Sequence, residues 1–145
     1  MSFLPDPDRQ PDFYRSVTAK RFFAWVFDTV VIILLSLIAV VFTAFIGAFF
    51  FAALYLLVGF VYRTVTIASG SGTWGMRFVG IELRDARGAR LDGSLALAHT
   101  LGYTVSMAIP VLQVISVLMM VLGSRGQGLT DAVLGTVALN RRVLA

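Results

Sequence analysis

The sequence has no cysteine and only one histidine, His99. Without cysteine there can be no disulfide bonds, thiolate metal sites or thiol nucleophiles, and one histidine is too few for a histidine-clustered metal centre. Charge is also scarce, because only 14% of the residues are charged, whereas ordinary soluble domains have roughly a quarter. These absences exclude several catalytic classes and argue against a soluble domain.

Phosphate-binding and catalytic motifs are missing as well. The stretch Gly70 to Gly75 matches G-x-G-x-x-G, with Asp92 17 residues further on. A dinucleotide site needs a strand before this motif and a helix after it, whereas here an apolar helix precedes it and a strand-like segment follows. We interpret the stretch as a hinge loop, and we expect a protein that is not an enzyme, binds no metal and carries no cofactor.

Long apolar runs are what the chain does have, with 58% hydrophobic residues and a mean hydropathy of +0.86. From Phe22 to Tyr62 the only charge is Asp28. At about 1.5 Å per residue this run is about 61 Å long, close to two crossings of a hydrocarbon layer about 30 Å thick. It predicts a transmembrane helical hairpin with apolar segments 22–43 and 48–62 and a turn between Thr43 and Phe51.

The polar interval 63–94 follows, and it contains a segment with strand-like alternation, Phe78 to Leu83. The DARG turn signal after it makes a short hairpin plausible. Near the carboxyl end, TVALN has a similar composition. We therefore predict a small cytoplasmic sheet that joins the two segments.

The third apolar segment, 95–122, is divided by Pro110. It forms either one kinked span or a re-entrant pair of half-length helices. Basic residues are concentrated before the first span and in the polar interval, which predicts a cytoplasmic amino terminus. A re-entrant pair would also keep Arg125, Arg141 and Arg142 on the cytoplasmic side. The expected fold class is an all-α membrane protein of the bacterial inner membrane, with a mobile cytoplasmic arm at 1–19 and a membrane domain at 20–142.

An ionisable residue lies within the first apolar segment. Asp28 follows Arg21 by two helical turns, so the two side chains share one face and the carboxylate is about 10 Å deeper. A carboxylate at mid-bilayer costs roughly 2.5 to 3.5 kcal/mol. We expect compensation from Arg21, Arg63, Arg77 or His99, or by protonation. Asp28 either orders the helices or binds a cation or proton.

Three separated motifs carry a resemblance to a known family. They are R-x-x-A-x-x-x-D at Arg21 to Asp28, TWGMRFVGIELRD from Thr73 to Asp85, and GQGLTDAVLGTVAL from Gly126 to Leu139. Together they resemble the RDD family of small integral membrane proteins. The resemblance implies that its defining arginine and two aspartates correspond to Arg21, Asp28 and Asp131. Trp74 departs from the family's usual proline, and Thr130 from its common His or Gly. Ion transport has been suggested for some members.

Asp131 follows a turn, where it either caps a short helix or pairs with Arg77 or Arg21 and clamps the carboxyl-terminal motif onto the first helix. The basic residues Arg84, Arg87 and Arg90 are candidate contacts for anionic lipid. In a chain this apolar, basicity predicts membrane lipids as partners, not nucleic acid. Two functions remain open: an accessory or assembly subunit that contacts other membrane subunits, or a homo-oligomeric cation or proton transporter that uses Asp28.

Overall fold

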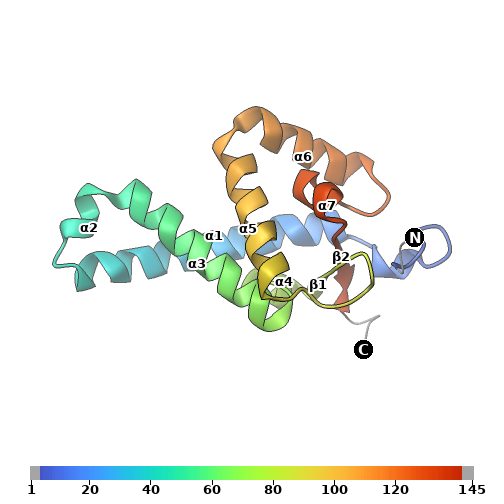
Figure 1. The fold of residues 1–145 in the computed structure, drawn as a ribbon, viewed down its shortest axis with the longest axis horizontal. Helices are drawn as coiled ribbons and strands as arrows, with labels where there is room; N and C mark the ends of the chain where they lie inside the picture. The colour runs from blue at the N-terminus through green and yellow to red at the C-terminus, as the bar shows by residue number, and fades with distance from the viewer. Residues whose placement is uncertain (1–3, 142–145) are drawn as a thin grey trace.

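The computed structural model describes residues 4–141, and its longest feature is a helical hairpin. Helix α1 (Val17–Phe42) and helix α3 (Phe51–Gly70) lie side by side, with the short helix α2 (Ile46–Phe49) at their tip (Figure 1). Both long helices are long and apolar enough to cross a membrane. The hairpin is therefore confirmed, and its turn falls inside the predicted interval. Left-handed backbone at Ala44 and Phe45 lets the chain reverse there.

The third apolar segment is two helices, α5 (Gly93–Ala108) and α6 (Pro110–Leu122), bent by 115°. Pro110 begins α6, where its missing N–H costs nothing, and the Ser106 hydroxyl donates to Gln113 Oε1 at 2.8 Å across the bend.

Both ends of the bent pair return to the same end of the hairpin. The Leu91 N–H, just before α5, donates to Ser71 Oγ beyond the end of α3, at 3.0 Å. Near the end of α6, the Met120 carbonyl accepts from Thr18 Oγ1 in the first turn of α1, also at 3.0 Å. Since these residues of α1 and α3 lie together at the open end of the hairpin, the geometry is that of a re-entrant pair.

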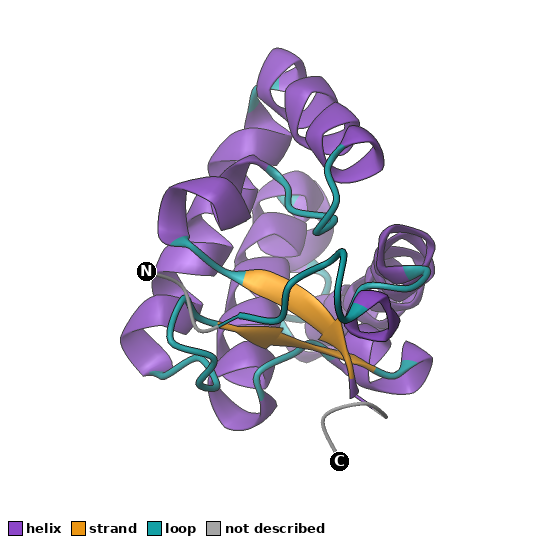
Figure 2. Cartoon of the chain, turned by 90° about the vertical axis from the view of Figure 1, so that its right-hand side faces the viewer, coloured by secondary structure: helices purple, strands orange, loops and turns teal. Residues whose placement is uncertain are grey.

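A two-stranded antiparallel sheet closes this end of the molecule (Figure 2). Strand β1 (Ile81–Arg84) pairs with β2 (Val137–Asn140), and Ile81 lies opposite Asn140. Each strand follows a short helix, α4 (Trp74–Val79) or α7 (Leu129–Leu134). The predicted joining of the two segments is confirmed. The local hairpin through DARG is wrong, because β1 takes β2 as its partner, and Phe78 belongs to α4.

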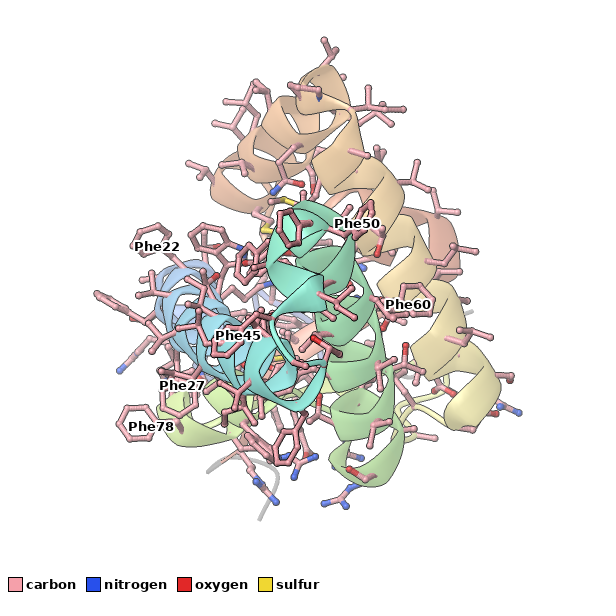
Figure 3. The ribbon with its side chains drawn as sticks, turned by 90° about the vertical axis from the view of Figure 1, so that its left-hand side faces the viewer. Phe22, Phe27, Phe45, Phe50, Phe60 and Phe78 are labelled. Carbon is pink, nitrogen blue, oxygen red and sulfur yellow. The ribbon has the colours of Figure 1, made fainter. Side chains whose placement is uncertain are left out.

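The main hydrophobic core lies at this sheet end, which we call the base. It contains residues from α1, α3, α4, both strands and α5: Val17, Ala24, Ile67, Met76, Ile81, Leu83, Leu91, Ala96 and Ala138. The far half of the hairpin contributes little to it, and Phe42 and Phe49 are 85% and 86% exposed. Figure 3 looks onto the molecule from the tip, where Phe45 and Phe50 lie. The protein thus has a packed base and a projecting apolar hairpin.

The amino-terminal segment, predicted to be a mobile arm, lies against the sheet. It includes the 3₁₀ helix η1 (Pro11–Phe13), and the Tyr14 hydroxyl donates to the Pro5 carbonyl at 2.8 Å. The Asn140 amide donates to the carbonyls of Asp12 and Arg15. The segment covers Val137 and Leu139 of β2, which would otherwise expose apolar surface. Composition alone did not reveal this, because the partner strand is more than 120 residues away.

Candidate functional site

Asp28 is fully buried on α1 and accepts hydrogen bonds at both carboxylate oxygens. Its Oδ1 accepts from the Tyr62 hydroxyl at 2.6 Å and from the Gly75 N–H at 2.8 Å, and its Oδ2 accepts from the Thr73 hydroxyl at 2.5 Å. A carboxylate that only accepts suits these three donors. The interactions connect α1, α3 and the beginning of α4.

The sequence of α4 explains how its backbone comes so close to α1. Thr73 caps the helix by accepting from the Met76 N–H, and Gly80 ends it with a left-handed backbone conformation (φ 81°). A Cβ at Gly75 would lie 2.2 Å from the Ala24 carbonyl oxygen. Only glycine fits this contact, and it brings the positive end of the α4 backbone to Asp28.

Of the two expected ways to compensate Asp28, a cation or protonation, the expectation of a cation is wrong. Within residues 4–141, the side-chain hydrogen-bond donors to Asp28 are neutral hydroxyls. Arg77 instead donates to the carbonyls of Gly72 and Thr66, at 3.0 and 2.5 Å, and to Ser69 Oγ. The glycine-rich stretch between α3 and α4 is accordingly a packed connection and not a hinge. Hydroxyls and backbone amides carry no charge signal in a sequence, which is why these donors were missed.

Asp131 is buried at the start of α7 and does bind cationic or potentially cationic groups. Its Oδ2 accepts from Arg21 Nη1 at 2.6 Å and from the Gly128 N–H at 3.0 Å. Its Oδ1 lies 2.9 Å from His99 Nε2 and accepts from the Thr136 hydroxyl at 2.7 Å. The predicted pair with Arg21 is confirmed, the pair with Arg77 is absent, and the capping role coexists with the clamp.

Burial alone would raise the pKa of the Asp131 carboxyl. The Arg21 guanidinium, together with hydrogen bonds from His99 and Thr136, outweighs that effect and holds this pKa well below its usual range. Asp131 therefore carries a charge that is matched inside the protein. The arrangement ties α7 to α1 and α5 at the base.

One face of α1 organises both sites. Arg21, Ala24 and Asp28 follow each other at helical spacing. Arg21 contacts α7, Ala24 lies against the α4 backbone, and Asp28 accepts from the Thr73 and Tyr62 hydroxyls. The fold and these contacts define a small helical membrane protein in which two buried aspartates fasten the segments after the hairpin onto the first helix.

The chain belongs to the RDD family, whose family model matches residues 15–135. The family assignment made from the three motifs is thus confirmed. Comparisons with the curated proteins and with the solved structures gave no match.

A cavity of about 850 Å³ lies between α1, α3, α5, α6 and α7, with Met76 of α4 also in its wall. Asp28, Asp131 and His99 contribute to its wall, as do apolar side chains of α1 and α6. Arg63 of α3 also lines it, and its Cζ lies 3.7 Å from the centre of the Tyr103 ring. The Tyr103 hydroxyl in turn accepts from Trp25 Nε1 at 2.8 Å.

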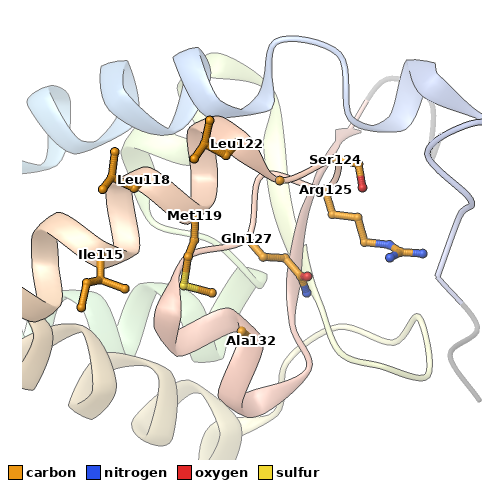
Figure 4. Close-up of a pocket in the computed structure, with 9 residues that line it drawn as sticks. Ile115, Leu118, Met119, Leu122, Ser124, Arg125, Gln127 and Ala132 are labelled. Atoms are coloured by element: carbon orange, nitrogen blue, oxygen red, sulfur yellow. The ribbon is translucent and has the colours of Figure 1, made fainter.

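A second hollow, of about 520 Å³, lies between α6, α7 and the loop that joins them (Figure 4). Ile115, Leu118 and Met119 make its wall apolar, and the Arg125 side chain points away from them. Its polar lining comes from Ser124, Arg125 and Gln127, and the Gln127 amide already donates to the Thr136 carbonyl at 2.7 Å.

The three predicted lipid contacts lie around the sheet and pair with carboxylates of the chain. Buried Glu82 pairs with Arg84 and lies 3.6 Å from Arg90. Arg87 lies 3.6 Å from Asp85, and its side chain is 80% exposed. The alternation that predicted a strand did not reveal that the carboxylate of Glu82 is buried among arginines. Of the three, Arg87 is the freest to contact anything outside the protein.

Proposed function

We propose that this protein is an accessory or assembly subunit of a larger membrane complex, and that it acts by associating with other integral membrane subunits through its hairpin. The observation that carries the proposal is the division of the molecule into two parts. The base is fastened by buried polar contacts, whereas the outer hairpin presents apolar side chains that no element within residues 4–141 covers, including Phe42, Phe45 and Phe49. A packed base with a projecting helical pair is suited to docking beside other helices.

The state of the two aspartates supports this proposal over catalysis or transport. Three donors occupy Asp28, and Arg21, His99, Thr136 and the Gly128 N–H occupy Asp131. A carboxylate that binds and releases an ion must give up such contacts in each cycle. Contacts this complete favour a structural role.

The distribution of charge supports an orientation in the bacterial inner membrane with the amino terminus in the cytoplasm. Apart from Arg63, the basic residues within 4–141 belong to the amino-terminal segment, the first turns of α1, α4, the sheet and the nearby loops: Arg9, Arg15, Lys20, Arg21, Arg77, Arg84, Arg87, Arg90, Arg125 and Arg141. Basic residues are enriched on the cytoplasmic side of membrane proteins. The base would then face the cytoplasm, and the tip would point across the membrane.

Photo-crosslinking from the hairpin tests the proposal. A photoreactive residue at Leu37 or Phe49, both exposed on the hairpin, should capture a distinct membrane protein in native membranes. The matched control carries the same residue at Phe78, which is 76% exposed but lies at the base and stacks on Phe27 (Figure 3). Crosslinks from the tip to this chain alone, with purification in mild detergent as a homogeneous oligomer, would contradict the accessory role.

Cation or proton transport by a homo-oligomer is the second candidate. The observation that favours it is that Asp28, Asp131 and His99 border one cavity. Under this alternative, Asp28→Asn abolishes ion flux into proteoliposomes while the protein still inserts and assembles. Asp92→Asn is the control, since Asp92 caps α5 at an exposed position outside the cavity. Absence of flux in the unmodified protein would exclude transport.

A further inference from the structure

Arg63 is a buried cation without a counterion. It belongs to α3 and is 6% exposed, and within residues 4–141 its Nε has no hydrogen-bond acceptor and its guanidinium forms no ion pair. Its guanidinium lies over the face of Tyr103, and such a contact only partly offsets lost hydration. Buried charges in membrane helices are normally paired. Arg63 therefore lacks a negative group.

The cavity that Arg63 lines has the form of an amphiphile site. Ser106 and Gln113 add polar groups to its wall, whereas Phe22 of α1 and Val117 and Val121 of α6 are apolar. Those three apolar side chains are between 45% and 62% exposed, so the cavity opens sideways toward the surroundings of the hairpin. A ligand could thus place a polar end inside and an apolar tail along α1 and α6.

The other charges at the cavity are already matched. Asp131 pairs with Arg21, and Asp28 accepts from three donors, so neither requires a cation and neither is available to Arg63. Arg63 lies seven residues before the end of α3, about 10 Å along the helix axis. A headgroup that enters the cavity from the base side of the membrane would reach this depth.

We propose that the cavity binds an anionic phospholipid, with its phosphate on Arg63 and its acyl chains along the groove between α1 and α6. Arginine is well suited to phosphate because its planar guanidinium donates two parallel hydrogen bonds. The apolar mouth selects a lipid over a free anion. This site is additional to the proposed accessory role, and it does not require that the hairpin bind another membrane subunit.

Quenching of Trp25 tests the proposal, because Trp25 lines the cavity and the chain has one other tryptophan. A Trp74→Phe protein is reconstituted in phosphatidylcholine vesicles that contain increasing amounts of phosphatidylglycerol with brominated chains. We expect saturable quenching at a low mole fraction of phosphatidylglycerol, and only gradual quenching by brominated phosphatidylcholine. Arg63→Gln should shift the phosphatidylglycerol midpoint about tenfold or more, the size of one lost charge-assisted contact.

Two further variants distinguish the loss of the lipid site from misfolding of Arg63→Gln. Arg63→Lys keeps the charge and should retain the preference for phosphatidylglycerol. Val117→Phe keeps Arg63 but narrows the mouth, and it should weaken saturable quenching. Identical curves for Arg63→Gln and its parent, or equal quenching by the two lipids, would overturn the proposal. Loss of the quenching by brominated phosphatidylglycerol when inorganic phosphate is added would also overturn it, by making a free anion the ligand.

Discussion

The regions around Asp28 and Asp131 are both buried against α1, but they neutralise a carboxylate in different ways. Around Asp28 the donors are two hydroxyls and a backbone N–H at the start of α4. Around Asp131 they include the Arg21 guanidinium, the His99 ring and a hydroxyl. In the first region the protein supplies dipoles, and in the second it supplies a full opposite charge.

The two regions differ in which groups lose their partner when the charge of the carboxylate is removed. Removing the charge of Asp131 leaves Arg21 buried and unpaired, because the Arg21 side chain is only 11% exposed. Removing the charge of Asp28 leaves three neutral donors, of which the Tyr62 and Thr73 hydroxyls can rotate to other acceptors. Two aspartates with the same burial should therefore differ in how much they stabilise the protein.

The largest expected effect is that of Asp131→Asn. It breaks a buried ion pair, a change that typically costs about 3 to 5 kcal/mol, and α7 should detach from α1 and α5. Chemical unfolding in a defined detergent measures the loss. The double variant with Arg21→Gln should recover part of it, because the orphaned guanidinium is gone. Equal losses of unfolding free energy for Asp131→Asn and Asp28→Asn would contradict the expected difference between the two regions.

Lowering the pH should also destabilise the protein, because protonation of Asp131 removes the same charge as Asp131→Asn. The loss from Asp131 should not exceed that of the substitution. The pKa of Asp131 is lowered in the folded state, so its contribution is fully present above the unfolded value, about 3.9, and is lost progressively as the pH falls from that value to the lower folded value, which means that only the first part of the loss is reached by pH 3. Thermal unfolding from pH 7 to pH 3 should show a fall in the midpoint on the acid side. Asp131→Asn should flatten that fall, and an unchanged slope would contradict the assignment.

The contact between α4 and α1 can be broken without touching a charge. In Gly75→Ala the new methyl would lie 2.2 Å from the Ala24 carbonyl oxygen, which is backbone and cannot rotate away. We expect a loss of about 1 to 3 kcal/mol, as for other overpacked sites. Gly93→Ala is the matched control, because nothing lies within 4 Å of a Cβ there. Equal unfolding free energies for the two variants would show that α4 can move away at no cost.

Asp28→Asn should cost less than Asp131→Asn. The amide oxygen can keep the two bonds now made to Oδ1, from Tyr62 and the Gly75 N–H, while the amide nitrogen faces the Thr73 hydroxyl. The loss should be about 1 to 3 kcal/mol, that of a compromised buried hydrogen bond. Unfolding in the same detergent measures it. Tyr62→Phe removes one donor alone and should lie at the lower end of that range.

The sequence could predict those parts of the molecule whose signals are local or charged. The length of the first apolar run, Pro110 in the third and the strand composition of TVALN led to the hairpin, the bend and the sheet. The pair of Arg21 and Asp131 could be anticipated because buried charges in an apolar chain are normally paired with an opposite charge.

The rest depended on contacts that have no sequence signature by themselves. Tyr62 is one of several aromatic residues in α3, and nothing in the sequence shows that its hydroxyl meets Asp28. One signal was present but not used: Thr73 and Gly80 bracket six residues as a helix cap and a helix stop, and they mark α4, whose last two residues, Phe78 and Val79, alternation had assigned to a strand. The burial of the Glu82 carboxylate among its arginines depends on the pairing of β1 with β2, which is more than 50 residues away in the sequence.

The smallest expected effect belongs to a charge pair outside both regions. Arg87 lies 3.6 Å from Asp85, and its side chain is 80% exposed, so water screens the pair and Arg87→Gln should change stability by about 0 to 1 kcal/mol. Added salt should reduce even that difference, whereas the loss in Asp131→Asn should persist at high salt because its pair is shielded from solvent. Unfolding at low and high ionic strength distinguishes the two. A large, salt-resistant loss in Arg87→Gln would mean that burial does not separate the strong charge contacts of this protein from the weak ones.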